Sequence, residues 1–451
     1  MSRELNRRKF LKRSALAAGA VAGTSWRGAP AILAAPAPNS KLGVAVIGCG
    51  GAGGGNPGAA AGERAVALVD VDDNTLGRAR DAIKDRAPGL RTYCDYRRMF
   101  DECAKDLDVV LIATPDHHHA PAAVRAIKLG KAAFVQKPMA HNIAECYALM
   151  KAAKEEKVAT QMGNQGHYGE TIRRVCEYIW SGAIGKVTET HTILGRNFGG
   201  SGGRPPSKPV PANLHWDEWL GPAPYRDYHD GLHPFNWRSW RQFGTGTIGD
   251  MACHNLDVLF WALRVADAKQ FTVECLSQKG GSEEMYSQDN VLLWEIPARG
   301  DMPPLKIHSY DHGALKPQPM KDAEKKYNVQ FGECTLFVGQ AGLIRTEGTA
   351  GGWQFLPAEK IKDLPEPPKT LARAHGGPVG DLFYAVKNGA TPCSDFVGSA
   401  GPLAAFVLTG HLAMSAGVGK RVEWDVEKMQ CTNMPEINQH VRREYRQGWE
   451  V

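Results

Sequence analysis

The sequence has no Cys-x-x-Cys pair, although its 451 residues include ten cysteines. Closely spaced cysteines are typical of structural zinc sites, so we predict that no metal is bound. The cysteines are scattered along the chain, and one of them, Cys49, lies inside a glycine-rich turn. Because disulfide-stabilised exported domains usually carry cysteines at regular spacings, this scatter predicts few or no disulfides.

The sequence also lacks an excess of charge outside its first 35 residues. That segment holds seven basic residues and one acidic residue, and the remainder holds 47 of each sign, so the whole net charge of +6 lies in the leader. A nucleic-acid-binding surface needs a basic excess clustered on one face of the folded domain. We therefore expect no nucleic-acid partner.

Long apolar runs are missing as well, because no run after the leader reaches the roughly 20 residues that cross a bilayer. We expect no membrane association of the mature protein. The leader itself has Arg7-Arg8, then Phe10-Leu11, an Ala/Gly run over 15–23, and small residues at 34–35. This order resembles a twin-arginine export signal over residues 1–35, with a basic amphipathic helix or an uncleaved anchor as alternatives. The expected location is periplasmic or otherwise exported.

The remaining chain is long enough for two domains and has an ordinary globular composition, with 43% hydrophobic and 23% charged residues. The patterns below divide it into an α/β Rossmann dinucleotide-binding domain over 40–160 and an α+β domain over 161–451. We expect the second domain to contain a large mixed or antiparallel sheet and to serve substrate binding and oligomerisation.

The first domain begins with an apolar run over 42–47, a glycine-rich turn, and a second apolar run over 65–69 that ends at Asp70. Glycines in such a turn allow a tight bend, close approach of a pyrophosphate and close helix packing. Asp70 follows Gly48 by 22 residues, where an acid binds the adenosine ribose hydroxyls. This carboxylate would repel a 2'-phosphate, so we predict NAD rather than NADP. The glycine- and proline-rich segment 53–58 predicts a delayed first helix.

Two further apolar runs, over 109–113 and 132–135, end in polar residues. Ligands bind beyond the carboxyl ends of strands in an open parallel sheet, so these ends should face the nicotinamide half of the cofactor. Three consecutive histidines, 117–119, follow the first run. Neighbouring side chains on an extended segment point in different directions, so we expect no metal there. His119 is expected to pack or to face the cofactor.

The second domain begins with a predicted strand over 159–168 and a helix over 170–180, followed by a segment over 199–238 that is rich in glycine, proline and aromatic residues. A loop this long inside a compact domain is usually functional. Clustered aromatic rings beside polar side chains suit a sugar. An insertion whose tryptophans form a core is the alternative. Strands over 291–296, 305–310 and 335–338 and helices over 380–416 complete the domain.

Asp250 and His254 are four residues apart in a predicted helix, so they lie on one face, one turn apart. A dehydrogenase needs a base near the alcohol proton, and histidine has the most suitable pKa. Taken alone, the pair fits a helix cap and a buried histidine equally well.

These motifs together resemble the glucose-fructose oxidoreductase and inositol dehydrogenase family, also called Gfo/Idh/MocA. The resemblance rests on the glycine turn, Ala113-Thr114-Pro115 with His119, Gly130-Lys131 and Lys137-Pro138. It implies that Lys137, Asp250 and His254 act together in catalysis, and that the protein is a homodimer or homotetramer. The family usually has glutamate before the Lys-Pro dipeptide, whereas this chain has Gln136.

The resemblance and the leader imply an NAD-dependent oxidoreductase that acts on a secondary hydroxyl of a sugar, polyol or glycoside. Because no free NAD pool is expected outside the cytoplasm, the cofactor should be tightly bound and recycled internally. An NAD-dependent glycoside hydrolase or lyase, working by transient C3 oxidation and elimination, is the alternative. A carbohydrate-binding protein without activity is a third.

The predicted site residues fall into three sets. Those for catalysis are Lys137, His254 and Asp250. Those for cofactor binding are Gly48, Gly50, Gly51, Gly53, Asp70, Thr114, Pro115, His119, Gln136, Lys137 and Gln165. Those for substrate binding are His167, Trp237, Arg238, Asp250 and His254.

Overall fold

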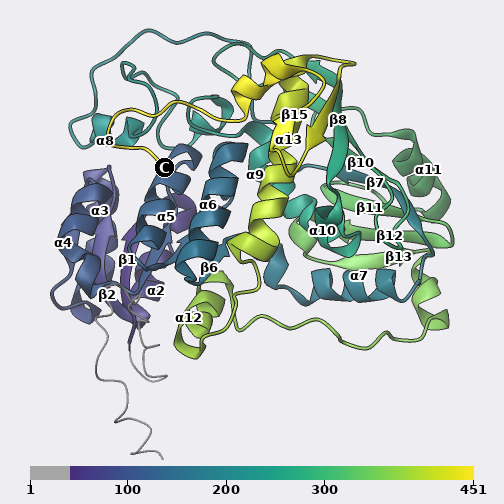
Figure 1. Cartoon of the computed structure of the whole chain (residues 1–451), viewed down its shortest axis with the longest axis horizontal. Helices are drawn as coiled ribbons and strands as arrows, with labels where there is room; N and C mark the ends of the chain where they lie inside the picture. Colours follow the sequence, from purple (N-terminus) through teal and green to yellow (C-terminus); the bar gives the residue numbers. More distant parts are fainter. Residues whose placement is uncertain (1–40) are drawn as a thin grey trace, which may run out of the picture. The chain divides into compact units, whose positions relative to one another are not determined.

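The computed structural model describes residues 41–451, which contain two sheets (Figure 1). The predicted export signal lies outside these residues. The first sheet has six strands in the order β3-β2-β1-β4-β5-β6, and every neighbouring pair is parallel. Its strands are β1 (Gly43–Ile47), β2 (Arg64–Val69), β3 (Arg91–Tyr93), β4 (Val109–Ile112), β5 (Ala132–Val135) and β6 (Thr160–Met162).

Strand β1 shows why the strands of the first sheet are continuous apolar runs in the sequence. Its alternate residues belong to different cores, Val44 and Val46 to one and Ala45 and Ile47 to the other. A parallel sheet covered on both faces buries every residue of its strands. The covering helices are α2 (Asn56–Gly62), α3 (Asp73–Ile83), α4 (Tyr96–Cys103), α5 (His119–Lys128) and α6 (Ile143–Glu156).

The first helix begins late, as the glycine-rich sequence predicts. A short 3-10 turn, Gly51–Gly53, follows β1, and α2 begins only at Asn56. The predicted Rossmann arrangement is therefore confirmed, including its departure from the usual first helix.

The second sheet has nine strands in the order β13-β12-β11-β7-β10-β9-β8-β14-β15. β7 and β10 pair in parallel and the other neighbours pair antiparallel, which confirms the expected mixed sheet. Its strands are β7 (Val187–Ile193), β8 (Gln270–Lys279), β9 (Gln288–Ile296), β10 (Leu305–Tyr310), β11 (Cys334–Gly339), β12 (Gly342–Glu347), β13 (Trp353–Leu356), β14 (Arg421–Asp425) and β15 (Gln430–Cys431).

The two faces of the second sheet carry different neighbours (Figure 1). Phe337 of β11 belongs to the large core, in which Phe406 of α13 (Gly401–Ala416) contacts Trp294 of β9. The next residue along, Leu336, points the other way and packs with Met320 of α11 (Gln318–Tyr327). The remaining helices are α7 (Glu170–Trp180), α8 (Trp216–Leu220), α9 (Gly246–Asn255), α10 (Asp257–Ala262) and α12 (Pro378–Asn388).

The helical span Phe396–Ala416, which ends with α13, is long and apolar enough to cross a membrane, with a mean hydropathy of 1.4. This differs from the expectation that no apolar run after the leader is long enough to cross a bilayer. The protein buries 72% of this window, so most of its apolar surface already packs against other parts of the chain.

Two late segments return to the first sheet. Leu382 of α12 shares a core with Phe134 of β5, and the Asp381 carboxylate accepts a hydrogen bond from the Gln161 side chain of β6. Near the end of the chain, the Trp449 ring packs edge-on against Tyr96 of α4. Of these late residues, Trp449 also lines the cavity described below.

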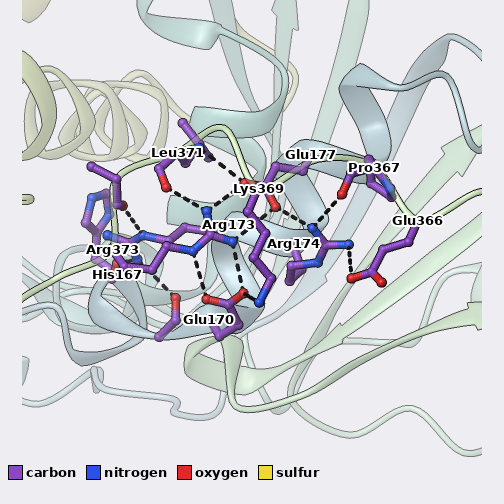
Figure 2. Close-up of polar contacts among 12 residues, drawn as sticks. His167, Glu170, Arg173, Arg174, Glu177, Glu366, Pro367, Lys369, Leu371 and Arg373 are labelled. Atoms are coloured by element: carbon purple, nitrogen blue, oxygen red, sulfur yellow. Dashed lines mark hydrogen bonds and ion pairs between the residues drawn. The ribbon is translucent and has the colours of Figure 1, made fainter.

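An ionic cluster fixes the extended segment 366–373 on α7 (Figure 2). The buried Glu177 carboxylate accepts hydrogen bonds from Arg373 and Arg174 at 2.7 Å each, and Arg373 also pairs with Glu170 at 2.9 Å. Arg173 donates to the Ala372 carbonyl at 2.6 Å. This segment connects β13 to α12 and has no sheet of its own, so the cluster supplies its attachment.

Candidate active site

The glycine turn after β1 is held tightly against the end of β4. A side chain at Gly48, where φ is +85°, would bring a Cβ within 2.4 Å of the Ala113 carbonyl oxygen. A Cβ at Gly53 would lie 2.3 Å from the Gly48 carbonyl oxygen. Both positions therefore require glycine, one for the bend and one for close packing. By contrast, a Cβ at Gly51 would meet no atom within 4 Å, which leaves open space on the ligand side.

A cavity of about 880 Å³ begins at this turn and continues past Asp70 to Lys137 and Arg238. Its volume lies within the usual range of small-molecule sites, about 300–1,000 Å³. The predicted site residues in its lining are Gly48, Gly50, Gly51, Asp70, Thr114, Pro115, Gln136, Lys137, Trp237 and Arg238. Thus one cavity joins the glycine turn, the ends of β4 and β5, and the loop before α9.

Asp70 lies at the end of β2 and is already bound to the backbone. Its carboxylate accepts from the Cys49 N–H at 2.8 Å and from the Asp72 N–H at 3.0 Å. Burial raises the pKa of Asp70, although these two hydrogen bonds oppose the shift. Asp72 itself caps α3 by accepting from the N–H groups of Asn74 and Thr75. A carboxylate has about four acceptor sites, so Asp70 retains capacity for a ligand hydroxyl.

Two arginines that the sequence analysis did not select, Arg78 and Arg86, also line the cavity at its Asp70 end. Arg78 lies in α3, the helix that follows Asp70, and its guanidinium donates to the Thr75 hydroxyl at 3.1 Å. A cation here bears directly on the choice between NAD and NADP, because guanidinium groups bind phosphate well.

His119 links the ends of β4 and β5 from behind the cavity wall. Its Nδ1 lies 2.6 Å from the Pro138 carbonyl oxygen and its Nε2 lies 2.9 Å from that of Thr114. Burial lowers the pKa of His119 to about 4. His117 and His118 likewise direct ring nitrogens at the Trp219 carbonyl. All three histidines therefore contact backbone carbonyls, His117 and His118 that of Trp219 and His119 those of Thr114 and Pro138.

Lys137 and Asp250 meet across the cavity wall. The Lys137 Nζ lies 3.1 Å from Asp250 Oδ1 and donates to the Asp250 carbonyl at 3.0 Å. Arg238 Nε donates to the same Oδ1 at 3.3 Å, and its guanidinium lies 4.2 Å from the centre of the Trp237 ring. Lys137 and Arg238 reach the cavity, whereas Asp250 lies behind them and fixes both.

His254 lies one helical turn after Asp250 on α9 and is 5% exposed. Burial and the nearby Lys137 lower the pKa of His254 to about 3, against the influence of Asp250. The imidazole is therefore neutral near pH 7. Its Nδ1 has no hydrogen-bond partner among residues 41–451. The structure thus brings His254 to Lys137 and Asp250 but does not place it in the cavity lining.

Asp116 is a further carboxylate of this site that the sequence analysis missed. It is 2% exposed, lines the cavity, and accepts from the Thr245 hydroxyl at 2.7 Å. Burial and the neighbouring Asp250 raise the pKa of Asp116 to about 7. Its position directly before the three histidines, at the end of β4, was the available sequence signal.

The structure does not bring Gln165 and His167 to the cavity. Gln165 is exposed and absent from the lining. The His167 ring stacks on Trp261, and its nitrogens contact the Asp257 carboxylate at 2.9 Å and the Cys393 carbonyl at 2.9 Å. Both nitrogens are thus engaged, which corrects the predicted placement of His167 beside a substrate. Its role is to hold the segment around Cys393.

The aromatic segment before α9 divides into core and cavity residues. Trp216 and Trp219 stack at 4.7 Å and are buried with Trp240 in a small core of their own. Trp237 belongs to the same core and also lines the cavity, next to the half-exposed Phe235. Trp219 lines the cavity as well, and the ring of Trp237 is the one that Arg238 contacts.

A parallel sheet with this glycine turn, a cavity along its strand ends and a lysine at the far end define a two-domain oxidoreductase with a dinucleotide-binding fold. The family model described as "Oxidoreductase family, NAD-binding Rossmann fold" matches residues 42–164. Its companion, "Oxidoreductase family, C-terminal alpha/beta domain", matches residues 182–291. The chain belongs to the Gfo/Idh/MocA family of oxidoreductases.

The chain is similar to curated relatives over part of their length. It is 32% identical over 137 residues to inositol 2-dehydrogenase of Salmonella typhimurium, covering 30% of this chain and 39% of that protein. It is 30% identical over 207 residues to glycosyl hydrolase family 109 protein 1 of Shewanella sp. MR-4, covering 41% and 44%. The matched regions thus span less than half of either relative.

Solved structures share the fold at low sequence identity. The aldose-aldose oxidoreductase of Caulobacter crescentus, complexed with glycerol, aligns with a TM-score of 0.55 at 17% identity over 85% of this chain and 99% of its own. The WlbA dehydrogenase of Bordetella pertussis, in complex with NADH and UDP-GlcNAcA, aligns with a TM-score of 0.56 at 17% identity, over 84% and 98%. Both likenesses extend over the two sheets.

Proposed function

We propose that this protein is an NAD-dependent oxidoreductase that acts on a secondary hydroxyl of a sugar, polyol or glycoside. The observation that carries the proposal is the single cavity that joins the glycine turn to Lys137, whose Nζ lies 3.1 Å from Asp250. The activities of two similar proteins, an inositol dehydrogenase and an aldose-aldose oxidoreductase, support the same substrate class.

The residues that would hold NAD fit its chemistry. The turn at Gly48–Gly51 leaves space for a pyrophosphate, and Asp70 has acceptor capacity for ribose hydroxyls. The nicotinamide end would lie toward Thr114, Gln136 and Lys137, beyond the strand ends. NAD, when bound, supplies the hydride acceptor. NAD is favoured over NADP by Asp70, and the nearby Arg78 is the residue that opposes this preference.

The polar groups of this chain would then handle the proton and the oxygen of the substrate. The Lys137 ammonium, held by Asp250, would donate a hydrogen bond to the reacting oxygen. The neutral imidazole of His254 would take up the hydroxyl proton as general base, after a rotation or through one water. Asp116, with a pKa near 7, would accept a proton passed on from the site. Arg238 and Trp237 would bind the remaining hydroxyls and a ring face.

A tightly bound cofactor, recycled within each catalytic cycle, follows from the proposed export of the folded protein. We test it by native mass spectrometry of the protein isolated after export, which should show one NAD per chain. Oxidised and unmodified sugars are then added while the absorbance of the reduced cofactor is followed. Bound NAD that is reduced by one sugar and reoxidised by another supports the proposal. Exported protein without NAD contradicts internal recycling.

An NAD-dependent glycoside hydrolase or lyase is the second candidate, favoured by the 30% identity to a glycosyl hydrolase family 109 protein. In that mechanism transient oxidation at C3 makes the C2 hydrogen acidic, and the C1 substituent leaves by elimination. The product formed in D₂O would then carry deuterium at C2, without net reduction of NAD. Simple oxidoreduction at C3 would release no aglycone.

Export through the twin-arginine route and assembly as a homodimer or homotetramer belong to the same proposal. The export leader rests on the order of Arg7-Arg8, Phe10-Leu11 and the small residues that follow. Light scattering after size-exclusion chromatography measures the assembly, and a monomeric mass at micromolar concentration contradicts it.

A further inference from the structure

Two parallel neighbours in the middle of the second sheet, β7 and β10, carry three metal-binding side chains on one face. His191 lies directly opposite His308 in the strand register, and Glu189 precedes His191 by two residues, so all three point the same way. That face is the one on which α11 packs near Ile193 and Leu336. The cluster is far from the glycine turn in the sequence and shares no residue with the cavity lining.

The donor atoms of the three side chains converge. Glu189 Oε1 lies 3.2 Å from His191 Nε2 and 3.3 Å from His308 Nε2, and all three atoms are within 4.8 Å of one another. Donors around a tetrahedral zinc ion, bound at about 2.0–2.2 Å, lie roughly 3.3 Å apart. The two carboxylate–imidazole separations thus already match those of a metal site.

The contacts of the two imidazole Nε2 atoms with the Glu189 carboxylate are long, at 3.2 and 3.3 Å. His191 Nε2 and His308 Nε2 are buried atoms without a hydrogen-bond partner among the described residues. Buried polar nitrogens are normally paired, so two orphaned ones beside one carboxylate indicate a missing ligand. The side chain of His191 is 2% exposed, whereas that of Glu189 is 36% exposed, so the cluster is closed on one side and open to solvent on the other.

Tyr310 contacts one of the three side chains on the side away from the converging donor atoms. Its hydroxyl lies 3.0 Å from His191 Nδ1. If this nitrogen donates to the phenol oxygen, the lone pair of His191 is on Nε2 and faces Glu189. Metal-binding histidines usually donate their second N–H in this way.

We propose that Glu189, His191 and His308 form a binding site for a divalent transition metal of the zinc type, with water as the fourth ligand. Three protein ligands and one open position are typical of zinc sites that keep an exchangeable coordination position. The two imidazole rings are stacked at 4.9 Å with 19° between their planes, so binding tilts them toward a common point. The metal joins the only parallel pair of the second sheet and so stabilises its centre.

The charged groups next to the cluster, Lys306 and Glu295, pair with each other. Lys306, which faces Glu189 in the register, places its ammonium 3.6 Å from Glu295. A metal-free arrangement, in which the Tyr310 hydroxyl donates to His191 Nδ1 and the imidazole Nε2–H donates to Glu189, is the competing explanation. It predicts no zinc binding.

The test uses full-length protein purified without a histidine tag and treated with a chelator. Zn²⁺ binding is measured by calorimetry and by metal analysis after dialysis, and Co²⁺ serves as a spectroscopic probe of tetrahedral geometry. We expect one Zn²⁺ per chain, a higher Tm with Zn²⁺, and a visible Co²⁺ absorption band. Glu189→Gln and His308→Gln should each weaken Zn²⁺ binding more than about tenfold, and Tyr310→Phe roughly tenfold.

The matched control is His215→Gln, which removes a histidine paired with a carboxylate, Asp73, at 2.9 Å outside the cluster. This variant should bind Zn²⁺ as the parent protein does. Each variant is first shown to keep its metal-free Tm and its NAD content, so that loss of folding cannot imitate loss of a ligand. Absence of stoichiometric Zn²⁺ binding, or equal binding by Glu189→Gln, His308→Gln and the parent, overturns the proposal.

Discussion

At the end of the cavity away from the glycine turn, Lys137 and Arg238 lie near the carboxylates Asp250 and Asp116. All of these except Asp250 line the cavity. Lys137 and Arg238 share Oδ1 of Asp250, which holds both cations in place from behind. Asp116 lies on the cavity wall and is drawn toward its neutral form by burial and by Asp250. A charged lysine beside a neutral imidazole, His254, is an arrangement that can bind an alkoxide oxygen and accept a proton.

The first prediction concerns Lys137 and His254. Lys137→Ala and His254→Ala should each lower turnover roughly a hundredfold or more, the usual scale for a general acid or base, while NAD stays bound. Turnover on the true substrate and bound NAD are measured on the same preparations. Because both groups act on one oxygen, the double variant should be little worse than the worse single variant.

The His254→Ala variant is the more decisive of the two, because His254 is buried and absent from the cavity lining. Near-normal turnover of His254→Ala would make the histidine structural and move the proton to Asp116. Asp116→Asn is therefore measured alongside. Loss of NAD from both variants would instead mean that they support the cofactor pocket.

The second prediction concerns the adenosine end. Asp70→Ala should weaken NAD binding and narrow the preference over NADP, because it removes a ribose acceptor and the repulsion of a 2'-phosphate. The Kd values for both cofactors are measured by fluorescence on cofactor-free protein. Arg78→Ala is the paired variant, and it should lower NADP affinity more than NAD affinity. An unchanged preference in Asp70→Ala would assign the selectivity to another group.

The position of a site residue could be predicted from the sequence where one short segment contains both a strand and the residue that follows it. The glycine turn, Asp70 and Lys137 follow strands directly, so their places at the sheet edge follow from the sequence. Gln165 and His167 were misplaced because a polar residue after a strand can face either a ligand or a neighbouring segment. Here Asp257 and Cys393, distant in sequence, determine the orientation of His167.

At the scale of elements, the strongest attachment of an irregular segment is the one between α7 and residues 366–373. Glu177 is buried and receives Arg373, Arg174 and the Leu371 N–H (Figure 2). Burial alone would raise the pKa of Glu177, but these hydrogen bonds outweigh it and lower the pKa to about 2. The carboxylate therefore stays ionised in the folded protein well below its ordinary range.

The third prediction follows from this shift. Glu177→Gln should lower the free energy of unfolding by about 3 kcal/mol at neutral pH, because it removes the buried carboxylate that the buried Arg174 and the partly buried Arg373 share. Since the folded pKa is depressed, the stabilisation is present above the unfolded pKa of about 4.3 and is lost as the pH falls toward 2. Urea unfolding at several pH values from about 2 to 7 measures it, because the loss is expected between the unfolded pKa and the folded pKa of about 2.

Glu366→Gln is the control for Glu177→Gln, because Glu366 pairs with the same Arg174 but its side chain is 72% exposed. Exposed pairs contribute roughly 0–1 kcal/mol, so this variant should unfold almost as the parent does. Equal losses in both variants would show that total charge, and not the buried carboxylate, matters.

Element prediction succeeded where hydrophobic periodicity is strong. The sequence gives the helix over 170–180 and the strand over 305–310 with the bounds that α7 and β10 have. It did not reveal β7 or β12, because their threonine, histidine and arginine residues interrupt the apolar alternation.

At the scale of the whole molecule, sites formed between distant segments escape a sequence reading. Glu189 and His191 lie more than a hundred residues before His308, and only the parallel pairing of β7 with β10 brings them together. The same holds for Trp449, which lines the cavity from the last residues of the chain. The spacing of the cysteines bears only on cysteine-type zinc sites, and it contains no information on a cluster such as Glu189, His191 and His308.

The last prediction concerns where the folded protein is delivered. Replacing Arg7 and Arg8 with lysine should leave the precursor in the cytoplasm, because a twin-arginine receptor recognises the guanidinium pair and not positive charge alone. Replacing Arg3 and Arg13 with lysine makes the same chemical change outside the pair and should leave export intact. Cell fractionation and immunoblotting measure both, and native mass spectrometry of the retained precursor reports its NAD. A folded precursor that already holds NAD in the cytoplasm supports loading before export, as internal recycling requires. Normal export of the Arg7, Arg8 variant would contradict the twin-arginine assignment, and with it the reason to expect a cofactor that never leaves the protein.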